Sequence, residues 1–259
     1  MRVATFNVNS IRSRLELVLD WLNRHGPDVL CLQETKVRDE DFPADPIRKE
    51  GYHVIFRGQK AHAGVAIISR EEPRETAFGL DDGGPPDEAR LIRALIAGIP
   101  VVNTYVPQGR SADSQLFQYK LRWLDRMRIF FQRHYSPQEP LLWMGDLNVA
   151  PEPIDVHDPV RLKNHVDFHP QARAALKQVL KWGFEDVFRR HHPDESGQYT
   201  FWDYRVPGAV ERGLGWRVDQ ILATVPLARR STGAWIDVQA RKVARPSDHT
   251  FLVAEFSAK

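Results

Sequence analysis

Apolar residues recur along the chain with two periods, one typical of strands and one typical of helices. The segments "RVATFNV" (2–8) and "DVLCLQE" (28–34) are rich in Val, Leu and Phe and predict buried strands. Between them, "SIRSRLELVLDWLNRHG" has leucines at helical spacing, with Ser10 expected as the N-cap and Gly26 as part of the stop signal. The beginning of the chain therefore predicts a strand–helix–strand unit.

The rest of the chain changes to strand-like runs with few helices between them. Long amphipathic helices are predicted at Asp113–His134 and at 170–183, and a loop rich in Asp, Gly and Pro at 81–87. The predicted strands are "YHVIFRG" (52–58), "GVAIISR" (64–70), "RLIRALIAG" (90–98), "PVVNTYVP" (100–107), "PLLWMGDLN" (140–148), "YTFWDYR" (199–205), "WRVDQILAT" (216–224), "WIDVQARKV" (235–243) and "TFLVAEFS" (250–257). Because strands outnumber helices, we expect two sheets with helices packed outside, in one compact domain over residues 1–259.

Composition restricts the class of protein only loosely. Apolar residues make up 42% of 259, enough for one large core, and a net charge of +2 accompanies 36 Lys and Arg and 10 His. Nucleic acid or phosphorylated partners are therefore permitted but not required. The single cysteine, Cys31, lies in a predicted buried strand, which favours a structural thiol and a reducing, cytoplasmic location. We expect no signal peptide, because Asn7, Asn9 and Ser10 interrupt any apolar core near the start, and no membrane span, because no apolar window is long enough.

Polar side chains are found at the ends of the apolar strands. They are Asn7, Glu34, Tyr105, Asp146, Asn148, Asp219, Asp248 and His249. Taken one at a time, each is better explained as an ordinary turn or rim residue. Taken together they favour a shared site, since carboxylates and amides at buried strand ends are costly unless they converge. Oxygen ligands and one imidazole suit Mg²⁺ or Mn²⁺, and metal-assisted hydrolysis of a phosphate ester is the reaction that fits best.

Seven motifs then give a family resemblance that runs from Met1 to Phe256. In order they are "FNVNSIR", "LQETK", "YVPQG", "GDLN", "YTFWDYR", "GWRVDQIL" and "PSDH". This order resembles the exonuclease III family of apurinic/apyrimidinic endonucleases, part of a superfamily that includes deoxyribonuclease I and inositol polyphosphate phosphatases. The resemblance implies an α/β fold: a four-layer α/β sandwich in which two mostly antiparallel sheets pack face to face with helices outside.

The resemblance also implies a role for each residue at the strand ends. Glu34 resembles the principal Mg²⁺ ligand, with Asn7 beside it and Asp248 near the metal. Asp146 is similar to the residue that activates the attacking water, and Asn148 to the one that orients it and contacts the phosphate; both are counted with the metal site. Catalytic roles are likewise implied for Tyr105, which would touch the scissile phosphate, for His249, which would stabilise charge on phosphorus, and for Asp219, which would orient the imidazole.

The expected partner is double-stranded DNA with abasic or 3′-blocked sites, bound by a monomer. The family's pocket for a flipped abasic sugar corresponds to Phe201, Trp202 and Trp216, although core packing is the alternative for one of the first two. Basic residues expected to contact phosphates are Lys60, His62, Arg110 and Arg212. Ala63 and a short segment after "YVPQG" depart from some relatives, in the region where the family contacts DNA.

The function expected from these motifs is Mg²⁺-dependent cleavage of the phosphodiester bond 5′ to an abasic site, with 3′–5′ exonuclease and 3′-phosphodiesterase action on the same site. Mn²⁺ is expected to substitute for Mg²⁺. One alternative is a phosphatase or phospholipase of the same superfamily, which should lack the aromatic pocket. Another is a non-catalytic DNA-binding module, which should have lost one or more of the eight strand-end residues.

Overall fold

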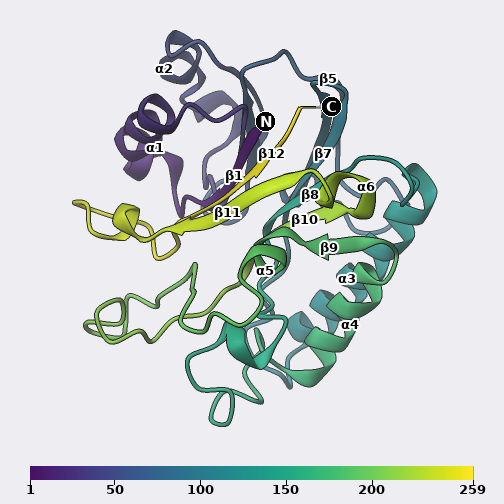
Figure 1. Cartoon of the computed structure of the whole chain (residues 1–259), viewed down its shortest axis with the longest axis vertical. Helices are drawn as coiled ribbons and strands as arrows, with labels where there is room; N and C mark the ends of the chain where they lie inside the picture. The colour runs from purple at the N-terminus through teal and green to yellow at the C-terminus, as the bar shows by residue number, and fades with distance from the viewer. Residues whose placement is uncertain (259) are drawn as a thin grey trace.

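Two six-stranded sheets form the centre of the molecule (Figure 1). The computed structural model describes residues 1–258. The strand order is β11-β12-β1-β2-β4-β3 in the first sheet and β5-β6-β7-β8-β10-β9 in the second. The strands are β1 Arg2–Asn7, β2 Val29–Gln33, β3 His53–Arg57, β4 Val65–Ser69, β5 Arg74–Phe78, β6 Leu91–Ile96, β7 Ile99–Tyr105, β8 Leu142–Asp146, β9 Phe184–Asp186, β10 Asp219–Thr224, β11 Ser231–Asp237 and β12 Phe251–Phe256.

Helices cover the outer faces of both sheets. The α-helices are α1 Ile11–His25, α2 Ala44–Lys49, α3 Gln115–His134, α4 Pro170–Leu180, α5 Val187–His191 and α6 Val225–Ala228. Helices α1 and α2 pack on the first sheet and α3 and α4 on the second, on opposite sides of the molecule (Figure 1). A third apolar cluster fills the space between the sheets. The predicted four-layer α/β sandwich is therefore confirmed.

Strand pairing is antiparallel at all but two places. β1 pairs with β2 in parallel because α1 crosses over between them, as the predicted strand–helix–strand unit requires. β7 and β8 are also parallel, and α3 lies between them in sequence. The parallel approach of β8 to β7 requires glycine at position 145, since an added Cβ would lie 1.9 Å from the Thr104 carbonyl oxygen. Gly145 also has φ of 146°, which L residues rarely adopt.

Strand alternation decides which side chains face the gap between the sheets. In β1, Val3 belongs to the inter-sheet cluster, so Asn7, four residues later, points to the same side at the end of the strand. In β8, Met144 belongs to the same cluster, so Asp146, two residues later, faces the gap. In β10, Ile221 belongs to it, so Asp219, two residues earlier, also faces the gap. Polar groups from both sheets therefore meet at one open end of the sandwich.

Local structure differs from the sequence-based prediction in the aromatic segment. Residues 199–205, predicted as a strand, form only isolated bridges, which link Phe201 to Trp216 and to His249. The neighbouring Trp202 N–H donates to the Asp248 carbonyl at 2.9 Å. The segment is thus a cross-connection between the loops at the open end rather than a strand of either sheet.

Several element boundaries were also predicted incorrectly or missed. The strand predicted at 235–243 ends at Asp237 and continues as a 3-10 helix, and the predictions did not include β5, β9 or the short helices α2, α5 and α6. Ser10 does not cap α1 with its side chain; its backbone N–H instead donates to the Glu34 carbonyl at 2.8 Å. Gly26 does end α1, in a left-handed conformation and with its N–H bonded to the Leu22 carbonyl.

Across residues 1–258, we find no helix that combines the length and apolar character needed to cross a bilayer.

Candidate active site

A cleft of about 390 Å³ opens where the ends of the two sheets meet. Its lining includes Glu34, Tyr105, Asn148, Asp248 and His249. A second cleft of about 390 Å³ adjoins it, shares Glu34 and Tyr105, and is also lined by His62. Side chains that are up to 215 positions apart in the sequence, from Glu34 to His249, thus surround one space.

The first group in this site is an amide that bridges the sheets. The side-chain Nδ2 of Asn7, at the end of β1, donates to Glu34 Oε1 and to Asp146 Oδ2, both at 2.9 Å. Asn7 is fully buried and Asp146 is 1% exposed, so the bond to Asp146 lies out of water, whereas Glu34 lines the cleft and its bond is only partly buried. A carboxylate from each sheet is therefore held next to the other by one amide.

Asp146 and Asn148 form a tight turn at the end of β8. The Asn148 N–H donates to Asp146 Oδ1 at 2.9 Å, and the Asn148 side-chain Nδ2 donates to the Val106 carbonyl at 2.9 Å. Asn148 has φ of 49°, a left-handed conformation that Asn tolerates better than most residues. Both side chains are thereby fixed at the base of the cleft.

His249 and Asp219 form a buried pair opposite this turn. His249 Nδ1 lies 2.8 Å from Asp219 Oδ2, and His249 Nε2 lies 3.9 Å from Asp146 Oδ2. Asp219 Oδ1 is buried and has no hydrogen-bond partner among the described residues. The geometry orients the imidazole with Nδ1 toward Asp219 and Nε2 toward the cleft, where it can donate to an anion.

Burial and neighbouring charges shift the titration of these groups. Burial alone would lower the pKa of His249, but the carboxylates of Asp219 and Asp146 outweigh it and raise that pKa. Burial, reinforced by Asp219 and Glu34, raises the pKa of Asp146. Burial likewise raises the pKa of the Tyr105 phenol well above its usual range. A protonated imidazole, a buried carboxyl group and a neutral phenol are thus available in one cleft.

Glu34 is surrounded differently from Asp146. Burial would raise its pKa, but the Lys36 ammonium, 2.6 Å from Glu34 Oε2, outweighs burial and lowers it. Lys36 also donates to Asn9 Oδ1 at 2.6 Å, and Asn9 Nδ2 donates to Asp248 Oδ1 at 2.9 Å. Asp248 therefore reaches the metal-site candidates through Asn9 and Lys36, two residues of the motifs that received no separate prediction.

The donor atoms fit a hard divalent cation. Carboxylates from Asp146 and Asp219 and the His249 imidazole lie within 4.8 Å of one another, and Glu34 is linked to them through Asn7. The carboxylate oxygens suit a hard divalent cation, whereas the protonated His249 imidazole, whose Nδ1 faces Asp219, has no free lone pair for a metal. Asp219 Oδ1 has no partner among the described residues, and Glu34 already binds the Lys36 ammonium. Both observations indicate an excess of negative charge that a cation would neutralise.

A buried polar network joins the two sheets beneath the site. Gln33, next to Glu34, donates through Nε2 to Thr5 Oγ1 at 2.9 Å and to Asn103 Oδ1 at 2.8 Å. The Asn103 Nδ2 donates across the gap to the carbonyls of Leu32 and Ala66. Because all these side chains are buried, the network fixes the spacing of the sheets two residues below Tyr105.

The three aromatic residues expected at the sugar pocket lie in two different places. Phe201 lines the cleft, with its ring 4.9 Å from the His249 ring, and belongs with Trp216 and Val218 to one apolar cluster. Trp202 is buried in a separate cluster with Tyr199 and does not line the cleft. The core-packing alternative therefore describes Trp202, whereas Val218, two residues after Trp216 in "WRVD", was missed by the sequence analysis.

The four basic residues expected to contact DNA also divide into two pairs. Arg110 lines both clefts and His62 lines one. Lys60 and Arg212 are exposed on loops and lie outside the lining of both clefts. Further cleft residues not singled out from sequence are Lys36, Arg90, Gln108, His165, Asp167 and Arg205. Three of these residues belong to family motifs: Lys36 to "LQETK", Gln108 to "YVPQG" and Arg205 to "YTFWDYR". The other three lie outside the motifs.

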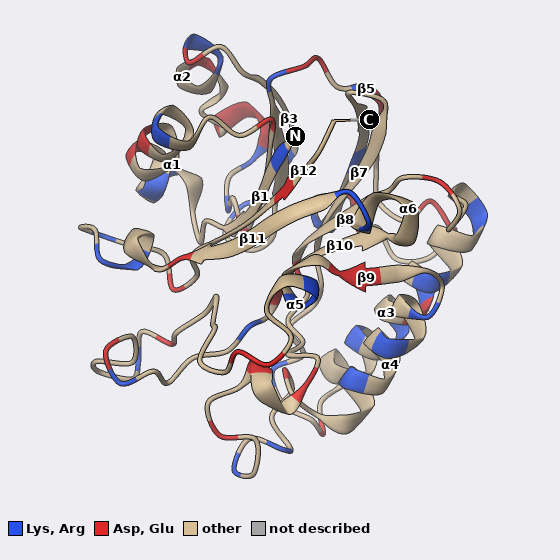
Figure 2. Cartoon of the chain, viewed as in Figure 1, with Lys and Arg blue, Asp and Glu red and all other residues tan. Residues whose placement is uncertain are grey.

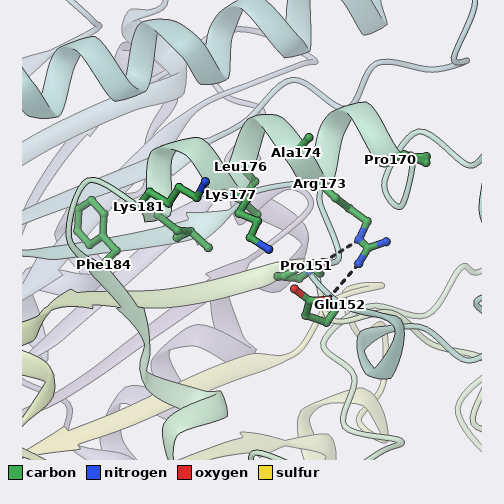
Figure 3. Close-up of a pocket in the computed structure, with 10 residues that line it drawn as sticks. Pro151, Glu152, Pro170, Arg173, Ala174, Leu176, Lys177, Lys181 and Phe184 are labelled. Atoms are coloured by element: carbon green, nitrogen blue, oxygen red, sulfur yellow. Dashed lines mark hydrogen bonds and ion pairs between the residues drawn. The ribbon is translucent and has the colours of Figure 1, made fainter.

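A separate pocket of about 510 Å³ runs along α4 (Figure 3). Figure 2 colours the Lys and Arg positions along this helix blue, and Figure 3 shows the Arg173 side chain paired with Glu152, at 3.0 Å. Leu176 and Phe184 contribute apolar surface. None of the site residues predicted from the sequence lines this pocket, so the cleft at the sheet ends, with its converging carboxylates, is the candidate active site.

Comparison with known proteins agrees with this geometry. The Endonuclease/Exonuclease/phosphatase family matches residues 4–249. Exodeoxyribonuclease III of Haemophilus influenzae is 32% identical over 267 residues, covering 99% of this chain and all of that protein. An AP endonuclease from Archaeoglobus fulgidus shares 56% identity with a TM-score of 0.98, and the 3′-5′ exonuclease NExo from Neisseria meningitidis shares 34% with a TM-score of 0.94; both alignments cover 100% of each chain. The chain belongs to the exonuclease III family of apurinic/apyrimidinic endonucleases, within the Endonuclease/Exonuclease/phosphatase family.

Proposed function

We propose that this chain, a phosphodiester hydrolase by family, is a Mg²⁺-dependent DNA repair nuclease that cleaves the DNA backbone 5′ to abasic sites. Trimming of 3′ ends, as 3′–5′ exonuclease and 3′-phosphodiesterase, is proposed for the same site. The observation that carries the proposal is that Glu34, Asn148 and His249 line one cleft, while Asn7, Asp146 and Asp219 lie buried behind them and bond to them. Relatives named as an AP endonuclease and as a 3′-5′ exonuclease support both activities.

In the proposed mechanism, residues of this chain hold the phosphate and move one proton. Asp146, buried at the base of the cleft, accepts the proton of the attacking water, which Asn148 orients. His249, kept protonated by Asp219, donates through Nε2 to the phosphate oxygens as negative charge increases there. Tyr105, neutral because of burial, donates its phenol hydrogen to the same phosphate.

Glu34, Asn7 and Asp248 are proposed to hold the metal, with Asp146 and Asn148 close to it. The bound cation supplies positive charge to the phosphate and to the departing 3′ oxygen. Mg²⁺ is the proposed ion, with Mn²⁺ substituting, because the donors are mainly oxygen atoms. Lys36 compensates the charge of Glu34 when that carboxylate is not bound to metal.

Selectivity for abasic sites is proposed to depend on the small apolar wall of the cleft. Phe201, Trp216 and Val218 form one apolar cluster next to His249. A sugar without a base loses little stacking when it leaves the duplex, so it flips at low cost and fits such a wall. Trp202 is left out of this wall, because its ring packs with Tyr199.

The proposed partner is duplex DNA with an abasic or 3′-blocked site. Arg110 and His62, which line the clefts, and Lys60 and Arg212, on exposed loops, are proposed to contact its phosphates. A monomer is proposed because every group of the site comes from one chain. A reducing, cytoplasmic location is proposed from the single buried thiol of Cys31.

The test is cleavage of a duplex that carries one tetrahydrofuran abasic analogue. We expect a single nick 5′ to the analogue with Mg²⁺, no nick with EDTA, and recovery on adding Mg²⁺ or Mn²⁺. An intact duplex of the same sequence is the control for selectivity. Folded protein that leaves the analogue uncut in the presence of either metal contradicts the proposal.

An Asp146→Asn variant separates catalysis from binding. The substitution keeps the volume but leaves one acceptor oxygen where the carboxylate has two, so it loses either the bond from Asn7 or that from the Asn148 N–H, and it removes the proton acceptor. We expect turnover to fall by roughly 10³-fold or more while duplex binding survives. Turnover within tenfold of the unsubstituted protein would show that another group accepts the proton.

A further inference from the structure

Lys120, on helix α3, is a fully buried lysine directly behind the active-site cleft. Its Nζ lies 3.1 Å from the Gln108 carbonyl, 3.0 Å from the Val166 carbonyl and 3.1 Å from Asp167 Oδ1, and it also donates to the Asn148 carbonyl. An ammonium group is costly to bury unless charge and hydrogen bonds compensate it. The surroundings provide both, although burial still lowers the pKa of Lys120 and Asp167 offsets only part of that effect.

The acceptors of Lys120 come from three separate loops that line the cleft. Gln108 follows β7 and Tyr105, Asn148 follows β8 and Asp146, and Asp167 precedes α4. All three residues line the cleft with Glu34 and His249. A single side chain from an outer helix thus fixes the relative positions of loops that have no strand pairing with one another.

The bond from Lys120 to the Asn148 carbonyl has the clearest consequence for the active site. Asn148 has φ of 49°, a conformation that persists in non-glycine residues when the surroundings fix it from several directions. Its N–H is held by Asp146, its side chain by the Val106 carbonyl and its carbonyl by Lys120. Lys120 holds the backbone carbonyl, which the turn itself leaves free, while the side-chain Oδ1 stays available to the cleft.

Asp167 completes the arrangement. Besides pairing with Lys120, its carboxylate accepts from Gln108 Nε2 at 3.2 Å, and its carbonyl accepts from the Ala150 N–H at 2.7 Å. The Asp167 N–H donates to His165 Nδ1 at 3.3 Å. The Lys120–Asp167 pair is therefore connected to two further residues of the cleft, Gln108 and His165, as well as to the end of the Asn148 loop.

We propose that Lys120, together with Asp167, is a positioning device for Asn148 and Gln108, which sets where the Asn148 amide meets the scissile phosphate. Lys120 touches no substrate, because it has no exposed surface. The inference rests on the proposed function, in which Asn148 orients water and contacts phosphate. Misplacement of a reacting group by about 1 Å can cost about 10²-fold in rate, so the effect belongs in kcat.

The first variants are Lys120→Met and the double variant Lys120→Met with Asp167→Asn. The single variant leaves the Asp167 carboxylate buried without its cation, so it loses both stability and positioning. The double variant removes both charges, so stability recovers at least in part, whereas the contact to the Asn148 carbonyl stays absent. We expect kcat on the tetrahydrofuran duplex to be roughly 10–100-fold low in both, with KM within about threefold. Lys120→Arg, which keeps the charge, should recover part of kcat.

Met127→Ala is the matched control. Met127 is a fully buried residue of the same helix, it belongs to the apolar cluster between α3 and the second sheet, and it carries no polar group that could hold the three loops. It should lower thermal stability through a cavity but leave kcat unchanged at temperatures where the protein is folded. A double variant that regains both stability and kcat would overturn the proposal, because the pair would then serve folding alone.

The crystal structure of the double variant gives a readout that does not depend on activity. Asn148 should leave the region around φ 49°, or its loop should shift relative to Gln108. An Asn148 turn that is unchanged without Lys120 would overturn the inference, whatever the turnover. The unsubstituted protein, assayed in parallel, separates this outcome from failure of the proposed function, since only the latter predicts no cleavage by the unsubstituted chain.

Discussion

Asp155 provides the prediction that the structure defines most sharply. This carboxylate is fully buried, and its Oδ1 accepts from Arg217 Nε at 2.7 Å and from Arg189 Nε and Nη2 at 3.1 and 2.6 Å. Arg217, also fully buried, donates onward to Asp186 at 2.7 Å. Arg217 lies between Trp216 and Val218, two residues of the apolar wall of the cleft. The network therefore holds in place the segment that leads into β10.

Replacing Asp155 with Asn keeps the shape but removes the charge that compensates two guanidinium groups. Hydrogen bonds to charged partners contribute about 1.5–3 kcal/mol each, and breaking a buried pair costs about 3–5 kcal/mol. Since the Asn oxygen still accepts and Asp186 still pairs with Arg217, we expect a loss near the lower bound, ~3 kcal/mol. For a chain of this size that loss lowers Tm by roughly 6–12 °C.

The loss should depend on pH in a defined direction. Burial would raise the pKa of Asp155, but Arg217 and Arg189 outweigh it and lower the pKa. A depressed carboxyl pKa stabilises the folded state above the unfolded pKa, and this contribution disappears as pH falls through the folded pKa. The difference between the unsubstituted protein and Asp155→Asn should therefore be full at pH 7 and shrink below about pH 4.

Urea unfolding followed by tryptophan fluorescence at pH 7.5, 5.5 and 4 measures this difference directly. Glu40→Gln is the control, because Glu40 pairs with Arg38 on the surface, where such a change is worth within about 0.5 kcal/mol. An Asp155→Asn variant as stable as the control at pH 7.5, or a difference that grows on acidification, would refute the reasoning.

Two further predictions concern the sheet gap and DNA binding. Gln33→Leu should lower the free energy of unfolding by about 1–3 kcal/mol in urea titrations, because Asn103 Oδ1 loses its donor inside the sandwich; an unchanged midpoint would contradict this. If Lys60, Arg110 and Arg212 each neutralise one phosphate, raising KCl from about 50 to 200 mM should weaken duplex affinity by roughly 40-fold in fluorescence anisotropy. Arg110→Ala should reduce the slope of log affinity against log salt by about one, and an unaltered slope would exclude its phosphate contact.

The general architecture could be predicted from sequence because it depends on local patterns. Alternation in 2–8 and apolar character in 28–34 predicted strands that the structure contains, and the helical spacing between them predicted the helix that joins them. The same alternation explains why Asn7 faces the gap between the sheets, as Val3 does. Polar residues at strand ends were therefore visible as a set before any contact was known.

Predictions failed where a distant partner determines the local structure. The segment 199–205 has strand-like composition, but its backbone groups bond to Trp216 and Asp248, so it links loops instead of extending a sheet. Trp202 and Phe201 are adjacent, and only the fold decides that the Phe201 ring lies by His249 while Trp202 packs with Tyr199. Ser10 has the residue type of an N-cap, but its side chain does not cap α1, and its backbone N–H donates to the carbonyl of Glu34, a residue distant in sequence.

The sequence by itself determined which residue types are available and on which face of each strand they lie, because period and chemistry are local properties. Only the tertiary structure decided that Glu34 and Asp146 share the Asn7 amide, and that Lys120, an apparently ordinary helix lysine, reaches three loops. These contacts depend on how the two sheets stack and on loops that are distant from one another in sequence. Periodicity records burial, but it does not record which buried group is the partner.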